Sequence, residues 1–355
     1  MIDSVKVGNS SIGPGNPCFI IAEAGVNHNG DVSLAHALID KAVEACADAV
    51  KFQHFVTEEL VTHDVPKAAY QVEATGKSDG QYTMLKALEL STEQHAELKL
   101  HCEKVGILYL CTAYDNTGID ILDNMGVAAF KIASTDTNNI PFLRHAAGKG
   151  RPIILSTGMS TLGEVEQAVE TLRAEGLNGR FAILHCTSEY PAPINEANLR
   201  ALLTMQHAFG CPVGFSDHTA GIETSTWAVA LGACLIEKHF TLDRNMPGPD
   251  HSASMEPDEL ANLVRTVRNV ELALGDGVKR VMPSELKNKS LMQKSLVAKR
   301  NIRAGQTISS DDLTCKRPGY GLSPSWFDRA IGRRAVVDIP RNQILTLSSL
   351  DWSES

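Results

Sequence analysis

No segment of the 355-residue sequence approaches the roughly 18 consecutive apolar residues that a membrane-spanning helix needs. The N-terminus, MIDSVKVGNSSIG, also lacks the basic start and apolar stretch of a secretory signal. An excess of positive charge is absent too, since the formal net charge is −9 and the isoelectric point is near 5.7. We therefore expect a cytoplasmic globular protein that binds neither nucleic acid nor membrane, with any anionic ligand held by individually placed lysines and arginines.

Closely spaced cysteines are missing as well. The eight cysteines are scattered along the chain without a CxxC pair. Several of them, such as Cys186 and Cys234, lie inside apolar runs. This pattern predicts buried free thiols and argues against a disulfide framework or a zinc ribbon.

Short runs of β-type residues alternate with helix-like segments over most of the sequence. Eight such runs occur, at 19–25, 49–55, 107–113, 128–134, 152–158, 181–187, 212–217 and 233–240. Segments with helical apolar spacing lie between them, for example 32–47 and 163–175, and a last one covers 256–274. This alternation implies a parallel sheet, and eight repeats match a closed (β/α)8 or TIM barrel. An open doubly wound sheet is the alternative, but no GxGxxG motif follows the first run.

The composition changes after Leu274. We predict a barrel over 1–274, in which the first 18 residues form a hairpin that closes the bottom. The polar segment 275–290 is typical of a linker. Short runs divided by turn residues then predict a small, separate β-rich domain over 291–355.

Polar residues end nearly every β-type run. In a TIM barrel the C-terminal ends of the strands meet at one mouth, where the active sites of such enzymes lie. Polar residues would be costly in a core but suit a wet pocket at that mouth. These residues are Glu23, Asn27 to Asn29, Lys51, Gln53, Thr112, Lys131, Ser134, Ser156, Thr157, His185, Ser188, Ser216, His218, Lys238 and His239.

The lysines and hydroxyl residues of this set are suited to a small dianion. Lys51 and Lys131 would supply charge, while the serines and threonine would supply directional donors, so phosphate or a phosphoenol is the expected guest. The alternative for each residue alone is that the lysine reaches the rim and the serine caps a helix. Because lysines and hydroxyl residues recur at the C-terminal ends of several runs, an anion-binding site is favoured over these separate explanations.

His218 and His239 each follow an apolar run, and those two runs are consecutive. Two imidazoles on adjacent strands, beside Glu23, Asp136 and Asp250, would suit a divalent ion such as Mn, Zn, Co or Fe(II), with open positions for a substrate. The alternative is that each histidine is simply packed or hydrogen-bonded. The remaining histidines, including His36, His95, His101 and His207, are expected at the surface.

A series of motifs resembles the bacterial sialic acid synthase family, which includes N-acetylneuraminate and N,N'-diacetyllegionaminate synthases. The motifs are IAEAGVNHNG, AVKFQ, FKIAS, ILSTGMS, LHCTSEYPAP, GFSDHTAG, EKHFTLD with PGPDHSAS, and KRPGYG, and they cover the chain from about residue 18 to its end. The resemblance implies a (β/α)8 barrel followed by a small antifreeze-like (SAF, β-clip) domain. It also implies a domain-swapped homodimer in which each C-terminal domain covers the partner's active site.

The resemblance also implies a reaction and roles for individual residues. Phosphoenolpyruvate would be joined to the open-chain aldehyde of an N-acetylated mannosamine-type sugar, with release of phosphate by C–O cleavage. His218 and His239 would bind a divalent metal, commonly Mn²⁺, with Mg²⁺ or Co²⁺ as alternatives. The contacts to phosphoenolpyruvate would be Lys51, Thr112, Lys131, Ser134, Ser156, Ser216 and Lys289. The residues that contact the sugar hydroxyl groups and the water would be Glu23, Gln53, Tyr190 and Asp250. Arg317 would contact the N-acetyl group. Glu23 or Asp136 would orient the water for its attack.

Two positions depart from the family pattern. Many members carry Ser-Gly-Glu where this chain has Ser134-Thr135-Asp136, so the acid is one methylene shorter and sugar recognition could differ. Some members have asparagine where this chain has Ser188, which can still donate to phosphate.

Two other function classes remain open, and so does the identity of the acceptor sugar. A metal-dependent barrel aldolase or other lyase would also use lysines and histidines at strand ends, and a Schiff-base aldolase would need one desolvated lysine. A non-catalytic sugar-binding protein is the other class, although the histidine pair and both lysines disfavour it. The acceptor sugar is either N-acetylmannosamine or 2,4-diacetamido-2,4,6-trideoxymannose, with a slight preference for the second.

Overall fold

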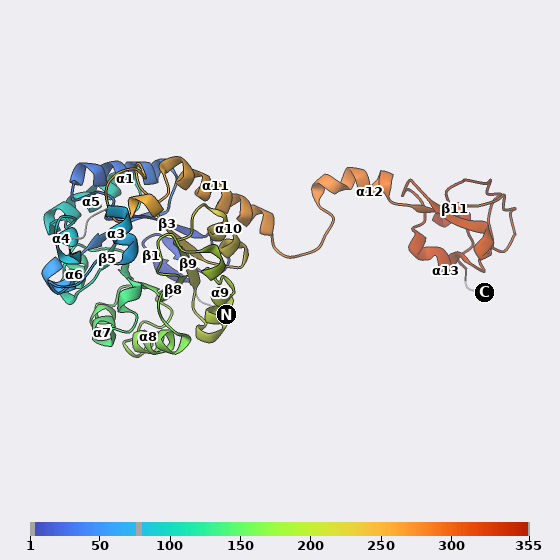
Figure 1. Cartoon of the computed structure of the whole chain (residues 1–355). Coiled ribbons are helices and arrows are strands. Elements are labelled where there is room, and N and C mark those ends of the chain that lie inside the picture. The colour runs from blue at the N-terminus through green and yellow to red at the C-terminus, as the bar shows by residue number, and fades with distance from the viewer. Residues whose placement is uncertain (1–3, 76–79, 354–355) are drawn as a thin grey trace. The chain divides into compact units, whose positions relative to one another are not determined.

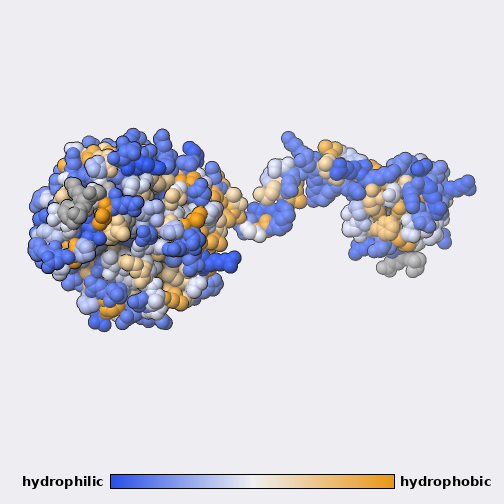
Figure 2. Space-filling view, viewed as in Figure 1, coloured by the Kyte–Doolittle hydropathy of each residue, from blue (hydrophilic) through white to orange (hydrophobic). Residues whose placement is uncertain are grey.

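The computed structural model describes residues 4–75 and 80–353. This part of the chain forms two compact units, which divide after Gly275. Within the described residues, no helix is long and apolar enough to cross a membrane. Figure 2 shows that the visible face of each unit is mainly hydrophilic, with hydrophobic residues in small scattered groups.

The first unit is a closed barrel of eight parallel strands, which confirms the predicted TIM barrel. Each strand pairs with the next, and β10 closes the barrel against β3. In register, Glu23 lies beside His239 on one side and beside Lys51 on the other. The strands are β3 Phe19–Gly25, β4 Ala49–His54, β5 Leu108–Ala113, β6 Phe130–Ile132, β7 Ile153–Ser156, β8 Phe181–Cys186, β9 Val213–Asp217 and β10 Leu235–His239.

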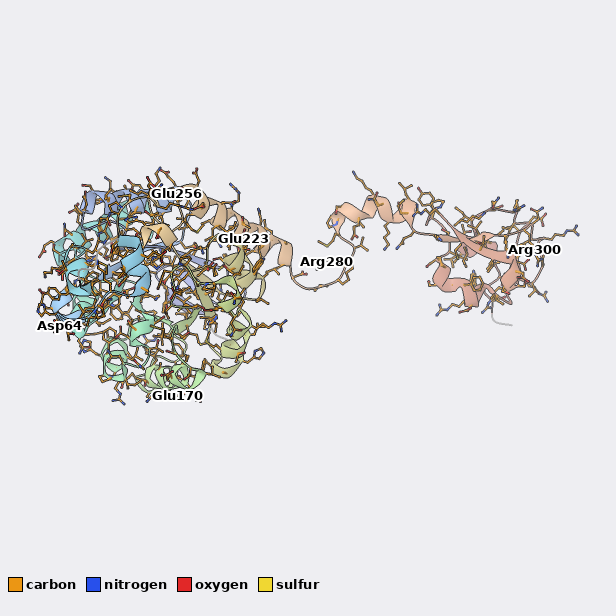
Figure 3. All side chains as sticks on the ribbon, in the orientation of Figure 1. Asp64, Glu170, Glu223, Glu256, Arg280 and Arg300 are labelled. Carbon is orange, nitrogen blue, oxygen red and sulfur yellow. The ribbon has the colours of Figure 1, made fainter. Side chains whose placement is uncertain are left out.

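Helices form a ring around these strands (Figure 1). They are α1 Val32–Glu44, α5 Thr92–Val105, α6 Asn116–Asn124, α7 Ile140–Gly148, α8 Leu162–Ala174, α9 Arg200–Phe209, α10 Glu223–Ala230 and α11 Pro257–Leu274. Three short helices, α2 Thr57–Leu60, α3 Ala69–Thr75 and α4 Gln81–Lys86, occupy the connection between β4 and α5. Charged side chains such as Glu170 lie at the outer edge of the ring (Figure 3).

The barrel strands are buried on both faces, which explains why their sequences are apolar along most of their length. Side chains that face outward, such as Ile20, pack under the helices in one large cluster. Side chains that face inward, such as Ile21, fill the barrel together with apolar residues of the hairpin β1 Val5–Val7 and β2 Ser10–Ile12. The hairpin therefore closes the N-terminal end of the barrel and leaves the cavity to the opposite end.

The second unit has an apolar core of its own. Its strands β11 Ser295–Ala298 and β12 Leu313–Lys316 pair antiparallel, and isolated bridges such as Ile302 to Ile339 extend the β structure. The short helix α13 Phe327–Ala330 packs against this core. The helix α12 Leu286–Met292 begins inside the segment 275–290 that the composition predicts as a linker.

His95 is buried, so its predicted place at the surface is wrong. It lies on the inward face of α5 at helical spacing from Leu98 and Cys102, which are also buried. Its Nδ1 lies 2.8 Å from the hydroxyl of Tyr109, and its ring packs against His54. The hydroxyl partner explains how a polar ring occupies an otherwise apolar stripe.

Buried histidines should make the barrel less stable in mild acid. Burial lowers the pKa of His28 to about 4 and that of His95 to about 3. Because the unfolded chain takes up a proton near pH 6.5 and the folded one does not, each residue destabilises the fold as the pH falls below about 6.5. We expect His95→Gln to reduce the loss of unfolding free energy between pH 7 and pH 5 by about 2 kcal/mol, measured by urea unfolding. His207→Gln, on the exposed face of α9, should leave that loss unchanged.

Candidate active site

The C-terminal ends of the barrel strands enclose a cavity of about 750 Å³. Most of the residues predicted at the mouth line it, namely Glu23, Lys51, Gln53, Thr112, Lys131, Ser134, Asp136, Ser156, Ser188, Tyr190, Ser216, His218, His239 and Asp250. Lys289 and Arg317 belong to the second unit, in α12 and directly after β12. Residues that are up to 227 positions apart in the sequence thus share one pocket because the strands are parallel and end together.

Lys51 lies at the base of this cavity and is 2 % exposed. Its Nζ is 2.6 Å from Glu23 Oε2 and donates to Thr112 Oγ1 at 2.8 Å. Burial disfavours the charged form of Lys51, but Glu23 and Glu237 outweigh it and raise the lysine's pKa. Glu23 also accepts a hydrogen bond from Gln53 at 3.1 Å. The ammonium group is therefore charged and held in one position.

Lys131 is the second buried ammonium group of the cavity. It donates to Ser156 Oγ at 2.7 Å, and its Nζ is 3.7 Å from Glu237 Oε1. Burial lowers its pKa, and Glu237 only partly opposes that shift. Lys131 and Lys51 both face Glu237, so the carboxylate lies between the two cations.

Glu237 lines the cavity but was missing from the predicted site. Burial opposes its ionisation, yet Lys131 and Lys51 outweigh burial and lower its pKa. Its Oε1 also accepts a hydrogen bond from Ser216 at 3.1 Å. The alternation of side chains along a strand would have revealed it, because Glu237 is two residues from His239 and therefore faces the same side.

The same alternation shows that some polar residues at strand ends do not reach the cavity. Lys238 points to the outer face of β10, where it pairs with Asp217 at 2.9 Å. His185 lies 2.9 Å from the carbonyl oxygen of Ala197, and the hydroxyl of Thr157 donates to the carbonyl of Leu184. None of the three lines this cavity, and neither do the predicted Asn27 to Asn29, so the inclusion of these residues among those of the mouth is wrong.

A tight turn after β7 brings Gly158 against two hydroxyl side chains of the site, which come from the segments after β6 and β8. The backbone N–H of Gly158 donates to Ser134 Oγ at 2.9 Å, and that hydroxyl also contacts Cys186 Sγ at 3.1 Å. A Cβ atom on Gly158 would lie 2.3 Å from Ser188 Oγ. Only glycine therefore lets the chain approach these side chains so closely.

His218 and His239 lie together, with ring centroids 5.6 Å apart. Nδ1 of His218 lies 2.6 Å from the carbonyl oxygen of Thr187, which fixes that nitrogen as the donor and leaves a lone pair on Nε2. Nδ1 of His239 is buried without a hydrogen-bond partner and is 4.0 Å from Asp250. Burial lowers the pKa of both imidazoles, so both are neutral.

These features fit two neutral nitrogen ligands of a divalent ion. Within residues 4–75 and 80–353, however, no group of three histidine, cysteine, aspartate or glutamate side chains is placed to hold a metal. A metal at the pair would therefore need further ligands from water or substrate.

Two more carboxyl groups and an aromatic ring complete the lining. Asp136 accepts hydrogen bonds from Asn139 at 2.9 Å and from Thr135 at 3.1 Å, and burial raises its pKa. Burial also raises the pKa of Asp250, to about 6. The ring of Tyr190 packs 4.2 Å from that of His218. Asp136, which is one methylene shorter than the glutamate of many family members, thus still lines the cavity. Its carboxylate is nevertheless hydrogen-bonded to Thr135 and Asn139 of its own segment.

Comparison with known proteins gives consistent results for both units. Residues 38–279 match the NeuB family and residues 293–351 match the SAF domain. The chain is 46 % identical to an N,N'-diacetyllegionaminic acid synthase of Campylobacter jejuni, over 92 % of this chain and 98 % of that protein. It is 38 % identical to the N-acetylneuraminate-9-phosphate synthase of Mus musculus, over 96 % of this chain and 94 % of that protein.

A solved structure gives the same result. The N-acetylneuraminic acid synthetase of Leptospira borgpetersenii, in complex with citrate, superimposes with a TM-score of 0.73 at 38 % identity. The similarity covers 81 % of this chain and 95 % of that one. The chain therefore belongs to the NeuB family, with a SAF domain at its C-terminal end.

Proposed function

We propose that the protein is a transferase that joins phosphoenolpyruvate to the aldehyde of an N-acetylated mannosamine-type sugar. The product would be a nine-carbon 2-keto acid, N-acetylneuraminate or N,N'-diacetyllegionaminate, and the by-product phosphate. One observation carries the proposal: two buried lysines with hydroxyl partners share a cavity with two neutral imidazoles, in a chain of the NeuB family. The names of the relatives support the class of product.

The lysines and hydroxyl groups would bind phosphoenolpyruvate. Lys51 and Lys131 supply positive charge in a place that water barely reaches, where ion pairs are stronger than at the surface. Hydroxyl groups on neighbouring strands would orient the phosphate and carboxylate through directional hydrogen bonds. These groups are Thr112, Ser134, Ser156, Ser188 and Ser216.

The carbon–carbon bond would form between C3 of the enol and the aldehyde carbon of the sugar. Water would add at C2, and the resulting tetrahedral intermediate would lose phosphate by cleavage of its C–O bond. Glu23 or Asp136 would orient the water as general base. Gln53, Tyr190 and Asp250 would hold the sugar hydroxyl groups.

His218 and His239 would hold a divalent ion, with Mn²⁺ as the expected metal and Mg²⁺ or Co²⁺ as alternatives. Such an ion would supply Lewis acidity toward the aldehyde oxygen of the sugar. The supporting observations are the buried, unpartnered Nδ1 of His239 and the carbonyl that fixes the tautomer of His218.

The second unit would complete the site in a domain-swapped homodimer located in the cytoplasm. In that assembly Lys289 would approach the phosphoenolpyruvate, and Arg317 would contact the N-acetyl group of the sugar bound by the partner. Support comes from the chemistry of these two cations and from the SAF domain that contains Arg317.

A Schiff-base aldolase remains the second candidate, because burial lowers the pKa of Lys131. A lysine that is desolvated in this way becomes a better nucleophile. Lys131 nevertheless donates to Ser156 and faces Glu237, which suits the binding of an anion.

Phosphate release tests the proposed function. With phosphoenolpyruvate, Mn²⁺ and either N-acetylmannosamine or 2,4-diacetamido-2,4,6-trideoxymannose, we expect sugar-dependent release of phosphate. EDTA should abolish it and added Mn²⁺ should restore it. Absence of release with both sugars, together with borohydride trapping of pyruvate on the protein, would replace the synthase by the aldolase.

A further inference from the structure

One side of the active-site cavity is apolar, although the base of the cavity is charged. Five of the apolar residues on this side, which we call the apolar wall, are Val26, Phe55, Leu60, Met84 and Leu88. Val26 and Phe55 directly follow β3 and β4, Leu60 and Met84 lie on α2 and α4, and Leu88 follows α4. They pack against one another as a cluster separate from the barrel core. Catalysis at the charged base uses none of them, so the wall requires another explanation.

Gly25, the residue before the first member of the apolar wall, lies beside His239. A Cβ atom on Gly25 would lie 3.5 Å from Cε1 of His239 and 3.4 Å from the side chains of Gln53 and Glu23. Val26 is the next residue of the chain. Tyr114 makes a second connection, since its hydroxyl donates to Gln53 at 3.1 Å while its ring packs on the wall. An acceptor whose aldehyde lies at His218 and His239 would therefore share one cavity with the wall.

Two glutamines stand among the residues that line this side of the cavity. Nε2 of Gln81 is 3.5 Å from Oε1 of Gln71, and Gln71 also accepts a hydrogen bond from the backbone of Ala68. Primary amides beside apolar side chains match the two parts of an acetamido group, which has an amide to hydrogen-bond and a methyl to bury. A hydroxyl group in the place of the methyl would lie against apolar side chains, which cannot replace its hydrogen bonds to water.

We propose that the apolar wall determines the acceptor specificity of the proposed synthase. It favours a sugar that carries a methyl and an acetamido group at the end remote from the aldehyde over one that carries hydroxyl groups there. This inference rests on the proposed function. 2,4-Diacetamido-2,4,6-trideoxymannose has these two groups, and N-acetylmannosamine has hydroxyl groups in their place.

Initial rates with the two sugars, at saturating phosphoenolpyruvate and Mn²⁺, test this inference. We expect the wild type to use the diacetamido sugar with a kcat/KM about 10- to 100-fold higher, since a single group in an apolar pocket gives discrimination of about this size. Met84→Gln and Leu60→Gln make the wall polar without a large change in volume. Each should lower that ratio about tenfold while the KM for phosphoenolpyruvate stays the same.

Leu100→Gln is the matched control, because Leu100 lies on α5 and is 64 % exposed. Thermal unfolding of each variant shows whether its fold is kept. A wild-type preference for N-acetylmannosamine, or a ratio that neither wall variant changes, would overturn the role of the wall and leave the synthase assignment intact. No phosphate release with either sugar would instead overturn the proposed function, and this inference with it.

Discussion

Lys131→Met is expected to lower kcat/KM for phosphoenolpyruvate by about a hundredfold to a thousandfold. Truncating one partner of a buried, hydrogen-bonded charge pair at a binding interface costs about 2–5 kcal/mol, and each ~1.4 kcal/mol corresponds to a factor of ten in rate. In this cavity the variant would deprive Ser156 of its donor at 2.7 Å and Glu237 of one of its two cations. The phosphate would then lie near the buried carboxylate of Glu237, whose negative charge would be balanced by Lys51 alone.

Initial rates over a range of phosphoenolpyruvate concentrations measure this loss. The KM for phosphoenolpyruvate should rise along with the fall in kcat, because in the proposed site the ammonium group would contact the anion in the ground state as well. Lys149→Met serves as control, since Lys149 pairs with Asp120 on the outside of the barrel. If Lys131→Met kept the wild-type KM and kcat while it remained folded, the assignment of Lys131 to anion binding would be wrong.

The sequence predicts the barrel and most of its mouth because both follow from local patterns. Each β-type run ends in a polar residue, and parallel strands bring those ends to one side of the fold. Lys51, Lys131 and His218 could therefore be assigned to one cavity before any contact between them was known. The assignment needed only the direction of the strands.

Other features depend on which face of a strand or helix each side chain occupies. Glu237 and Lys238 are adjacent in the sequence, yet one faces two lysines in the cavity and the other pairs with Asp217 outside it. Polarity alone could not separate them, but the alternation from His239 would have done so. His95 shows the same error on a helix, where the apolar spacing with Leu98 predicts burial more reliably than the polarity of the ring.

The apolar wall could not be predicted, because it forms between segments whose positions depend on tertiary packing. Met84 and Leu88 come from the long connection between β4 and α5, whereas Val26 follows β3. Short helices such as α2 and α4 give weak periodic signals in a sequence. The proposed determinant of acceptor specificity in this chain thus lies in a region where sequence patterns are least informative.

His239→Asn should abolish the proposed metal-dependent activity, with a loss of about a thousandfold or more in kcat, because a bound Lewis acid would supply several kcal/mol of transition-state stabilisation. The reason lies in the donor set: the barrel offers two imidazoles, and Asp250 is 4.0 Å from His239. With no third protein ligand in the described residues, the loss of one imidazole leaves too little to retain the ion.

Binding of Mn²⁺, measured by calorimetry on the apoprotein, separates this effect from a change in substrate position. Wild type should bind one ion per chain, and His239→Asn should bind it at least about tenfold more weakly. His207→Asn should match the wild type, because His207 lies exposed on α9. Unchanged Mn²⁺ affinity in His239→Asn would show that the metal is held elsewhere. The unpartnered Nδ1 of His239 would then require a different explanation, such as a hydrogen bond to the sugar itself.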